Sequence, residues 1–504
     1  MESATETADA AAQAPTDAAA DDDADTTAAA AAAAVEKQPG AGKARSRLRR
    51  RVLTGSVAGG LVLGGVLLCL PGEEAGRPAP GPAPGARAQA AVRTGAAAAL
   101  PDLAVLIGER EARVRARPKD ARSWAVLGAA YVEHGRRTAD TAAFYPKAER
   151  ALRTSLSVRP AGNTEALVGL AALANARRDF PAARSWGEAA RKRAPKRWTA
   201  YPQLIDAYTG LGDHKRAKAA LDRLLELRSG PAVLARAAAV YRDRGWREDA
   251  AAALSDAAAG AVSPAERAAY LERAGQLAFE RGEREPALRH FQEAVRIDPD
   301  QRAAQAGQGR ALAALGRTTE ALTAYRAALA KQPLPQYALE LGELYESLGM
   351  DRAARVQYGL LRERVRREAA GGVDGALVLG RFEADHGDPA AAVRRLGTEW
   401  RRQPGVEVAD ALGWALHRAG RPEEGLRYAV IATDRAHRGT VRSAPYLYHR
   451  GMIERQLRRE GAARRHLEEA LRINPYFSPL YARTARTALV ALGEPSVARV
   501  PDFS

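Results

Sequence analysis

The sequence predicts an all-α protein in which about ten pairs of helices stack into a solenoid, after a single N-terminal transmembrane helix. Three observations support this prediction. The chain has 504 residues, more than one hydrophobic core usually holds, so several domains or a repeat array are expected. A pattern of small, aromatic and proline residues recurs every 34 residues in its larger, C-terminal part. Near the N-terminus, an uncharged run of nineteen residues follows a cluster of arginines.

The first 51 residues divide into an acidic and a basic segment. Residues 1–42 consist mainly of alanine, aspartate and threonine, with nine acidic groups against one basic group. They have almost no large apolar side chains and cannot bury enough surface to offset the entropy of ordering, so we expect a disordered cytoplasmic tail. Residues 43–51 form a basic flank with six basic groups and no acidic ones.

Residues 52–70, which read VLTGSVAGGLVLGGVLLCL, contain no charged side chain. As a helix they would be about 28 Å long, close to the hydrocarbon thickness of a bilayer. Basic residues precede this run and Glu73 and Glu74 follow it, so the positive-inside rule places the N-terminus in the cytoplasm and the larger part of the chain outside. The sequence therefore predicts a single-pass signal anchor in the cell membrane, from Val52 to Leu70.

Three alternatives to an uncleaved anchor remain open. A cleaved signal peptide needs an A-x-A site soon after the apolar run, whereas residues 88–90 lie about twenty residues further on. A lipoprotein would use Cys69, but Leu68 precedes it where a small residue is required. The pair Arg50 and Arg51 faintly resembles a twin-arginine export signal. Because Cys69 is the single cysteine of the chain, a disulfide scaffold and a cysteine metal cage are excluded.

Residues 71–100 are rich in proline, glycine and alanine. Such a composition predicts a solvated, partly extended linker. At the polyproline rise of about 3.1 Å per residue, this linker would hold the following domain up to tens of Å from the bilayer.

Residues 101–495 contain an internal repeat, and a short tail follows at 496–504. Gly282 and Gly316 are 34 residues apart, as are the prolines at 299 and 333. A glycine supplies the left-handed conformation that ends one helix, and a proline ends the next because it cannot continue a helix. The spacing therefore predicts stacked helical hairpins.

This pattern resembles the tetratricopeptide repeat, whose signature is W-x2-L-G-x2-Y followed by A-x3-F and a closing proline. Residues 124–131, WAVLGAAY, match the opening of that signature. The resemblance implies a right-handed superhelix whose concave side is lined by the first helix of each pair. Segments 144–163, 408–416 and 448–480 are also similar to membrane-anchored repeat proteins of high-GC, actinobacterial type.

Ten units are expected, with single capping helices at 101–117 and 478–492 that cover the ends of the stack. The first unit contains an insertion at 133–146, and the loops at 367–375 and 433–445 are longer than in the family. The turns inside the units are expected near His134, Arg178, Gly212, Gly245, Gly282, Gly316, Gly349, Gly387, Gly420 and Arg458.

No catalytic or metal-binding pattern stands out in the sequence. The eight histidines form no H-E-x-x-H motif, and neither a glycine-rich phosphate loop nor G-x-S-x-G is present. Residues 385–388, DHGD, are expected at a helix turn, where aspartate and glycine are ordinary cap residues. His417 and His449 are expected to pack or to line a groove rather than to bind a metal. The sequence predicts a non-enzymatic protein with no cofactor and no metal site.

The implied concave groove gives the candidate binding residues. The middle units contribute Asp206, Glu272 and Gln276. The last two full units contribute a tryptophan and a tyrosine with methionine and arginine nearby, which is the composition of a binding hot spot if these side chains are exposed; the alternative is that Trp414 is ordinary packing between repeats. The predicted partner-binding residues are Arg310, Glu343, Glu346, Arg381, Asp410, Trp414, His417, Tyr448, Met452 and Arg455.

These observations predict a membrane-anchored scaffold that binds a protein or peptide partner in its groove. Residues 101–504 carry a net charge of +18, so an alternative is a basic module that binds anionic wall polymer or lipid, although arginine also simply solvates exposed helix faces. A cytoplasmic regulatory protein is a further alternative. No DNA-binding motif is present, so no nucleic-acid partner is expected. The oligomeric state stays open.

Overall fold

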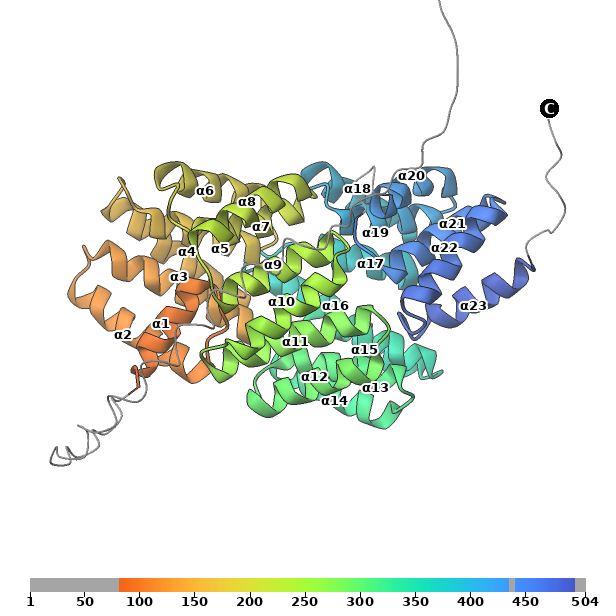
Figure 1. Cartoon of the computed structure of the whole chain (residues 1–504), viewed down its shortest axis with the longest axis horizontal. Coiled ribbons are helices and arrows are strands. Elements are labelled where there is room, and N and C mark those ends of the chain that lie inside the picture. The colour runs from red at the N-terminus through yellow and green to blue at the C-terminus, as the bar shows by residue number, and fades with distance from the viewer. Residues whose placement is uncertain (1–80, 435–439, 495–504) are drawn as a thin grey trace, which may run out of the picture. The chain divides into compact units, whose positions relative to one another are not determined.

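The computed structural model describes residues 81–434 and 440–494. Within these residues the chain forms 23 α-helices and no strand (Figure 1). The first twelve helices are α1 (Pro84–Thr94), α2 (Leu100–Ala116), α3 (Ala121–Thr138), α4 (Thr141–Val158), α5 (Thr164–Ala176), α6 (Phe180–Arg193), α7 (Ala200–Gly210), α8 (His214–Leu227), α9 (Pro231–Asp243), α10 (Arg247–Ala259), α11 (Pro264–Glu280) and α12 (Arg284–Ile297). The others are α13 (Arg302–Ala314), α14 (Thr318–Lys331), α15 (Pro335–Ser347), α16 (Asp351–Ala369), α17 (Ala376–His386), α18 (Pro389–Arg402), α19 (Val406–Arg418), α20 (Pro422–Thr433), α21 (Ala444–Gln456), α22 (Glu460–Ile473) and α23 (Tyr481–Ala491).

Consecutive helices pack as pairs, from α1 with α2 to α21 with α22, and α23 ends the array. The small residues of the repeat pattern make this packing possible. Phe291 of α12 is fully buried between Gly275 of α11 and Gly307 of α13. A Cβ atom on Gly275 would lie 2.7 Å from this ring, and one on Gly307 would lie 2.4 Å from it. The predicted all-α helix-pair solenoid is therefore confirmed, and its glycines are required where a ring enters from the neighbouring helix.

Most of the predicted turns lie where the pattern placed them. Residues at eight of the ten predicted turns have the positive φ angles of a left-handed turn; they are Arg178, Gly212, Gly245, Gly282, Gly316, Gly349, Gly420 and Arg458. Two turns differ. Gly387 has a φ of −143°. The first unit turns at Ala139 rather than His134, because the expected insertion is absorbed into longer α3 and α4 helices, with Pro146 inside α4.

The N-terminal end of the array differs from the prediction of an extended linker. Helix α1 lies within residues 71–100 and pairs with α2, so α2 is not the single cap that was expected at 101–117. Ala88 of α1 packs with the buried Leu103 and Leu106 of α2. Pro84 occupies the start of α1, where a missing N–H is harmless, and the alanines that follow favour a helix. The proline and glycine content of the whole segment concealed this short alanine-rich helix.

The other N-terminal predictions concern residues outside the described part of the chain. These are the tail at 1–42, the basic flank at 43–51, the anchor at 52–70 and most of the linker, and the C-terminal tail at 496–504 lies outside it too. Among the helices that the structure describes, none combines the length and the apolar character needed to span a bilayer.

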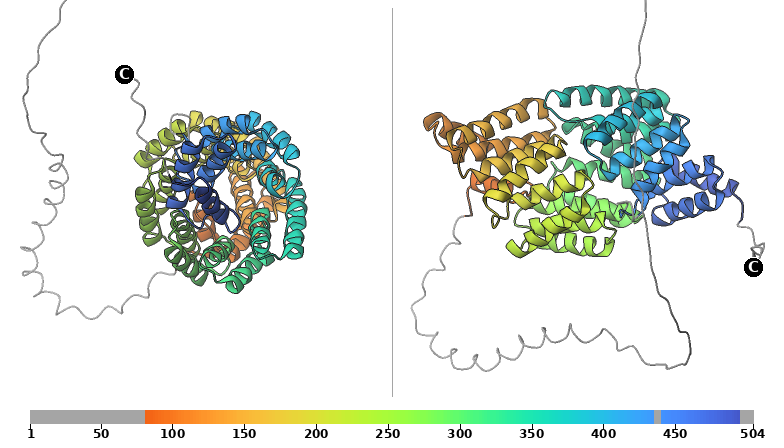
Figure 2. Two further views of the ribbon diagram at one scale, coloured as in Figure 1. Left: turned by 90° about the vertical axis from the view of Figure 1, so that its right-hand side faces the viewer. Right: turned by 90° about the horizontal axis from the view of Figure 1, so that it is seen from above.

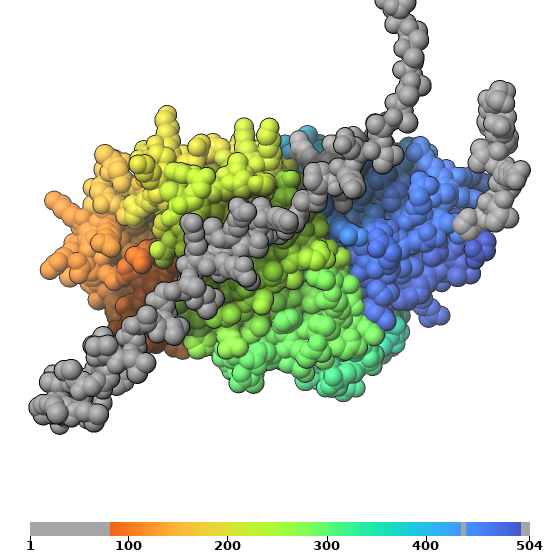
Figure 3. Space-filling view, in the orientation of Figure 1, coloured from red at the N-terminus to blue at the C-terminus, as the bar shows by residue number. Residues whose placement is uncertain are grey.

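Successive turns of the superhelix contact each other, and the helices form a ring when viewed along its long axis (Figure 2). Each contact joins the end of the first helix of a pair to a loop about 195 residues later, between the fifth and sixth helix pairs further on. The start of α6 in the first turn thus lies beside the end of α18 in the second (Figures 1 and 3). The hydrogen bonds run from Gln332 Nε2 to Arg136 O (2.9 Å), from Asp374 N to Arg177 O (2.9 Å), from Thr440 Oγ1 to Asp243 O (2.5 Å) and from Asn474 Nδ2 to Phe279 O (2.7 Å).

Candidate binding surface

The odd-numbered helices form the inner ring of the array. Those from α1 to α21 pack against their own partners, and neighbouring odd-numbered helices also pack closely against each other, with the exception of α9 and α11. Their inward faces carry charged side chains that pair between neighbouring helices. Arg236 of α9 pairs with Asp206 of α7, and Arg242 Nε lies 2.7 Å from Glu280 Oε2 of α11. The concave surface is therefore polar, but part of its charge is neutralised within the protein.

A cavity of about 370 Å³ lies on this concave surface. Two of the predicted residues, Arg310 of α13 and Glu343 of α15, line it. Ala313, Ala314 and Leu344 supply apolar wall. The remaining lining comes from Phe279, Tyr325 and Glu340 and from the segment after α22, which contributes Pro475, Tyr476, Phe477, Ser478, Pro479, Ala482, Arg483 and Arg486. The cavity therefore lies between the inner helices and the folded-back C-terminal segment of the chain.

Hydrogen bonds hold the polar wall of the cavity in place. Glu340 receives hydrogen bonds from Arg310 Nη2 at 2.9 Å and from the Tyr325 hydroxyl at 2.9 Å. Burial raises the pKa of the Glu343 carboxyl. Arg483, in contrast, is exposed and has no carboxylate within 4 Å among the described residues. Arg486, which also lines the cavity, is exposed and without such a carboxylate as well. The cavity thus offers two cations without carboxylate partners, one weakened acid and an apolar wall, which suits the mixed chemistry of a polypeptide segment.

The imidazole of His386, on α17, lies beside the same carboxylates. Its Nδ1 is 3.1 Å from Glu346 Oε2 and its Nε2 is 3.6 Å from Glu343 Oε1, and the side chain is 7% exposed. The ring also stacks on Tyr358 with centroids 4.6 Å apart. Burial disfavours the imidazolium, but Glu343, Glu346 and the nearby Asp385 outweigh it, and the pKa of His386 is raised.

This arrangement predicts a pH-dependent contribution of His386 to stability. A histidine whose pKa is raised on folding stabilises the fold fully below its unfolded pKa of 6.5 and loses that effect as the pH rises through its folded value. The difference in free energy of unfolding between the native chain and His386→Gln should therefore be largest near about pH 5.5 and smaller near about pH 8.5. Urea titrations at the two pH values measure it; a difference that grows with pH would contradict the assignment.

Trp414 and Tyr448 are buried, which corrects the expectation of an exposed hot spot. Trp414 is 4% exposed and Tyr448 is 1% exposed. The indole Nε1 donates to Asp385 Oδ1 at 2.8 Å, and its ring stacks on His449 at 4.4 Å. Tyr448 stacks on Tyr481 of α23, with centroids 5.4 Å apart. These rings form the core between α17, α19, α21 and the final helix, so the packing alternative describes them.

The other predicted residues are divided between this core and the polar inner face. Asp410 is buried and lies 2.9 Å from His449 Nδ1, and Met452 packs at the edge of the same core. Glu346 accepts a hydrogen bond from the Tyr358 hydroxyl at 2.7 Å. Arg381 is partly buried and Arg455 is exposed. Gln276 bonds to Arg310, whereas burial raises the pKa of Glu272.

The histidines of this region differ in their surroundings. Burial and the neighbouring His449 and Arg418 lower the pKa of His417 to about 4, so its imidazole is neutral. The described residues contain no group of three or more histidine, cysteine or acidic side chains placed to hold an ion.

Sequence reasoning missed part of the cavity. Glu340 precedes Glu343 by three residues, so both lie on one helix face, and this spacing could have identified it. Tyr476, Phe477 and Arg483 gave no such signal. Their position depends on the contact between Asn474 and Phe279, 195 residues apart, which a local pattern does not contain.

Comparison with known proteins gives matches to one repeat family. The tetratricopeptide repeat pattern matches residues 272–338 and 306–363, and a second version of it matches 444–477. No curated protein matches the chain. Among solved structures, the human IFIT1 dimer with PPP-AAAA is 17% identical and covers 63% of this chain and 73% of its own, with a TM-score of 0.43. A tetratricopeptide repeat protein from Parabacteroides merdae is 15% identical, and the match covers 52% of this chain and 98% of that protein, with a TM-score of 0.32. The protein pilF of Pseudomonas aeruginosa is 20% identical, and the match covers 44% of this chain and 97% of pilF, with a TM-score of 0.33.

Proposed function

We propose that this tetratricopeptide repeat protein is a non-catalytic scaffold, anchored in a membrane, that holds a polypeptide partner in the cavity of its concave surface. The observation that carries the proposal is the cavity between α13, α15 and the segment after α22, where Arg310 and Glu343 meet an apolar wall. Its volume of about 370 Å³ lies within the range of ligand pockets. Successive superhelical turns bind each other, so the surface between them is occupied by the protein itself. This supports partner binding on the concave face rather than between the turns.

Filling the cavity should abolish partner binding without unfolding the array. Ala313 lines the cavity and is partly exposed, so Ala313→Trp places a large ring there with little loss of packing. The control is Ala219→Trp at an exposed position of α8. A pull-down with the full chain should recover a polypeptide that Ala313→Trp loses at least tenfold and that Ala219→Trp retains. Equal recovery by both variants at equal helicity would contradict binding in this cavity.

The membrane part of the proposal follows from the uncharged run at 52–70 and the basic residues before it. It places residues 1–42 in the cytoplasm and the array outside. Protease added to intact protoplasts should digest a C-terminally tagged array without lysis. Protection of the tag would instead favour a cytoplasmic regulatory protein. The similarity to actinobacterial proteins of this type stays a prediction.

A further inference from the structure

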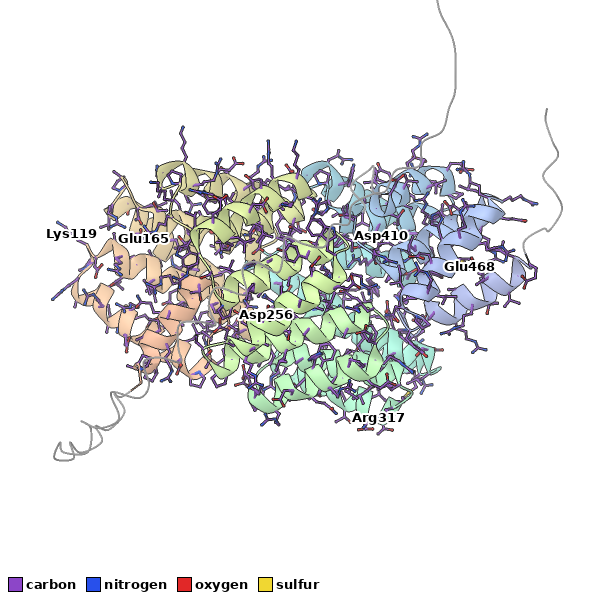
Figure 4. The ribbon with its side chains drawn as sticks, viewed as in Figure 1. Lys119, Glu165, Asp256, Arg317, Asp410 and Glu468 are labelled. Carbon is purple, nitrogen blue, oxygen red and sulfur yellow. The ribbon has the colours of Figure 1, made fainter. Side chains whose placement is uncertain are left out.

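The loops between helix pairs of the first superhelical turn lie on one end face of the array. The opposite ends of these pairs contact the second turn, so the loops are left at the surface. Figure 4 shows Lys119 and Glu165 toward this end and Glu468 toward the other. We call this surface the basic end face and define it by the loops between α2 and α3, α4 and α5, α6 and α7, and α8 and α9, with the helix ends beside them.

Seven basic side chains of the basic end face are exposed and have no carboxylate within 4 Å among the described residues. They come from only two of its loops and the adjoining helix ends. Two depressions of the surface are lined by this set and its neighbours. The seven residues are Arg117, Lys119, Arg122, Arg191, Lys192, Arg193 and Lys196.

The opposite rim of the array is different, although it is also rich in arginine. There, arginines at two of the turns pair with the first turn of the next helix, whereas Arg458 and Arg459 have no carboxylate within 4 Å among the described residues. Arg317 lies 2.7 Å from Glu320, and Arg421 lies 2.7 Å from Glu424. The basic end face therefore gathers seven unpaired cations on two loops, whereas part of the charge of the opposite rim is neutralised by local ion pairs.

We propose that the basic end face docks on the anionic lipid head groups of the membrane that holds the anchor. The inference rests on the membrane part of the proposed function. Gly81 follows Leu70 by eleven residues, which span at most about 40 Å even when fully extended. The array is thus tethered close to the bilayer by the end that carries α1 and α2. A clustered set of unpaired arginines and lysines is the surface that attracts anionic lipids.

The expected binding is electrostatic. Each arginine or lysine near an anionic membrane adds about a tenfold factor at most to the affinity, and salt screens the attraction beyond a distance of about 10 Å. Removing three of the seven charges should therefore weaken binding at least tenfold. Raising the ionic strength from about 0.05 M to about 0.5 M should release the native surface.

The test uses the full chain with Leu61→Arg and Leu67→Arg, which put two charges into the apolar run and prevent insertion by the anchor. In this background, Lys192→Gln, Arg193→Gln and Lys196→Gln neutralise the basic end face. The matched control is Arg352→Gln, Arg355→Gln and Arg366→Gln, three exposed side chains of α16 that have no carboxylate within 4 Å among the described residues. Co-sedimentation is measured with phosphatidylcholine vesicles that contain about one-third phosphatidylglycerol, and with pure phosphatidylcholine.

We expect the protein to bind the anionic vesicles but not pure phosphatidylcholine, and to be released at high salt. The triple variant of the basic end face should bind at least tenfold more weakly, and the control variant less than about twofold more weakly. Equal binding of the two variants would overturn the proposal. Tighter binding of polyuridylate than of vesicles, with the same dependence on the three residues, would overturn it in favour of a nucleic-acid surface. The intact chain is tested separately by carbonate extraction. If carbonate extracts the intact chain from membranes, the anchor is refuted. If the intact chain stays in the membrane but the chain with Leu61→Arg and Leu67→Arg does not bind the anionic vesicles, only the docking surface is refuted.

Discussion

Trp414→Ala is expected to lower the free energy of unfolding by about 3–5 kcal/mol, the range for removing a buried tryptophan from a packed core. The indole is 4% exposed, and it contacts His449 and Tyr448 as well as Asp385. The variant leaves a cavity among these rings and removes the hydrogen bond that the indole N–H donates to Asp385. Urea-induced unfolding followed by far-UV circular dichroism measures the change.

The matched control is Trp246→Ala. Trp246 has the same side chain but is 39% exposed and contacts mainly Tyr241 and Arg244. Its loss should cost less than half as much stability. If Trp414→Ala left the unfolding curve unchanged and weakened partner binding instead, Trp414 would be a contact residue and the packing interpretation would be wrong.

Arg137→Met is expected to destabilise the contact between the two superhelical turns by about 3–5 kcal/mol, the cost of leaving one member of a buried ion pair without its partner. The Arg137 side chain is 5% exposed, and its Nη2 lies 2.9 Å from Asp298 Oδ2. Its Nη1 also donates to the carbonyl oxygen of Ala98 at 2.6 Å. Methionine fills a similar volume but supplies neither hydrogen bond. We expect a lower unfolding midpoint and, by small-angle X-ray scattering, a larger radius of gyration.

The control for this variant is Arg317→Met. Arg317 also pairs with a carboxylate, but both side chains are close to half exposed, and exposed pairs contribute little to stability. No measurable change is expected. Equal effects of the two substitutions would show that the turn-to-turn ion pair adds nothing to the closure of the superhelix.

The sequence predicted the local part of this fold well. Glycine at a turn and an aromatic ring opposite a glycine are requirements of single helix pairs, so the pattern from Gly275 to Phe291 located both helices of its unit. The contact between superhelical turns was not predicted. It depends on side chains such as Arg137 and Asp298, which are 161 residues apart, and on the small rotation added by each pair, which no motif encodes.

The candidate site was predicted in part for the same reason. Arg310 and Glu343 lie on the inner faces of α13 and α15, and a helical repeat is sufficient to place them there. Trp414 has an inner-helix position too, but α23 and the rings around it cover the indole. Exposure is set by the whole packed array, so the sequence could not separate a contact residue from a core residue at this position.

The most direct test of the scaffold proposal is photo-crosslinking in living cells from a benzophenone side chain at position 313. The probe would project into the cavity lined by Arg310, Leu344 and Tyr476, and the same probe at the exposed position 219 on α8 serves as the reference. We predict a discrete polypeptide adduct from position 313 and none from position 219. Irradiation that gives no adduct at 313, or the same adducts at both positions, would contradict the claim that the concave cavity is the partner-binding site.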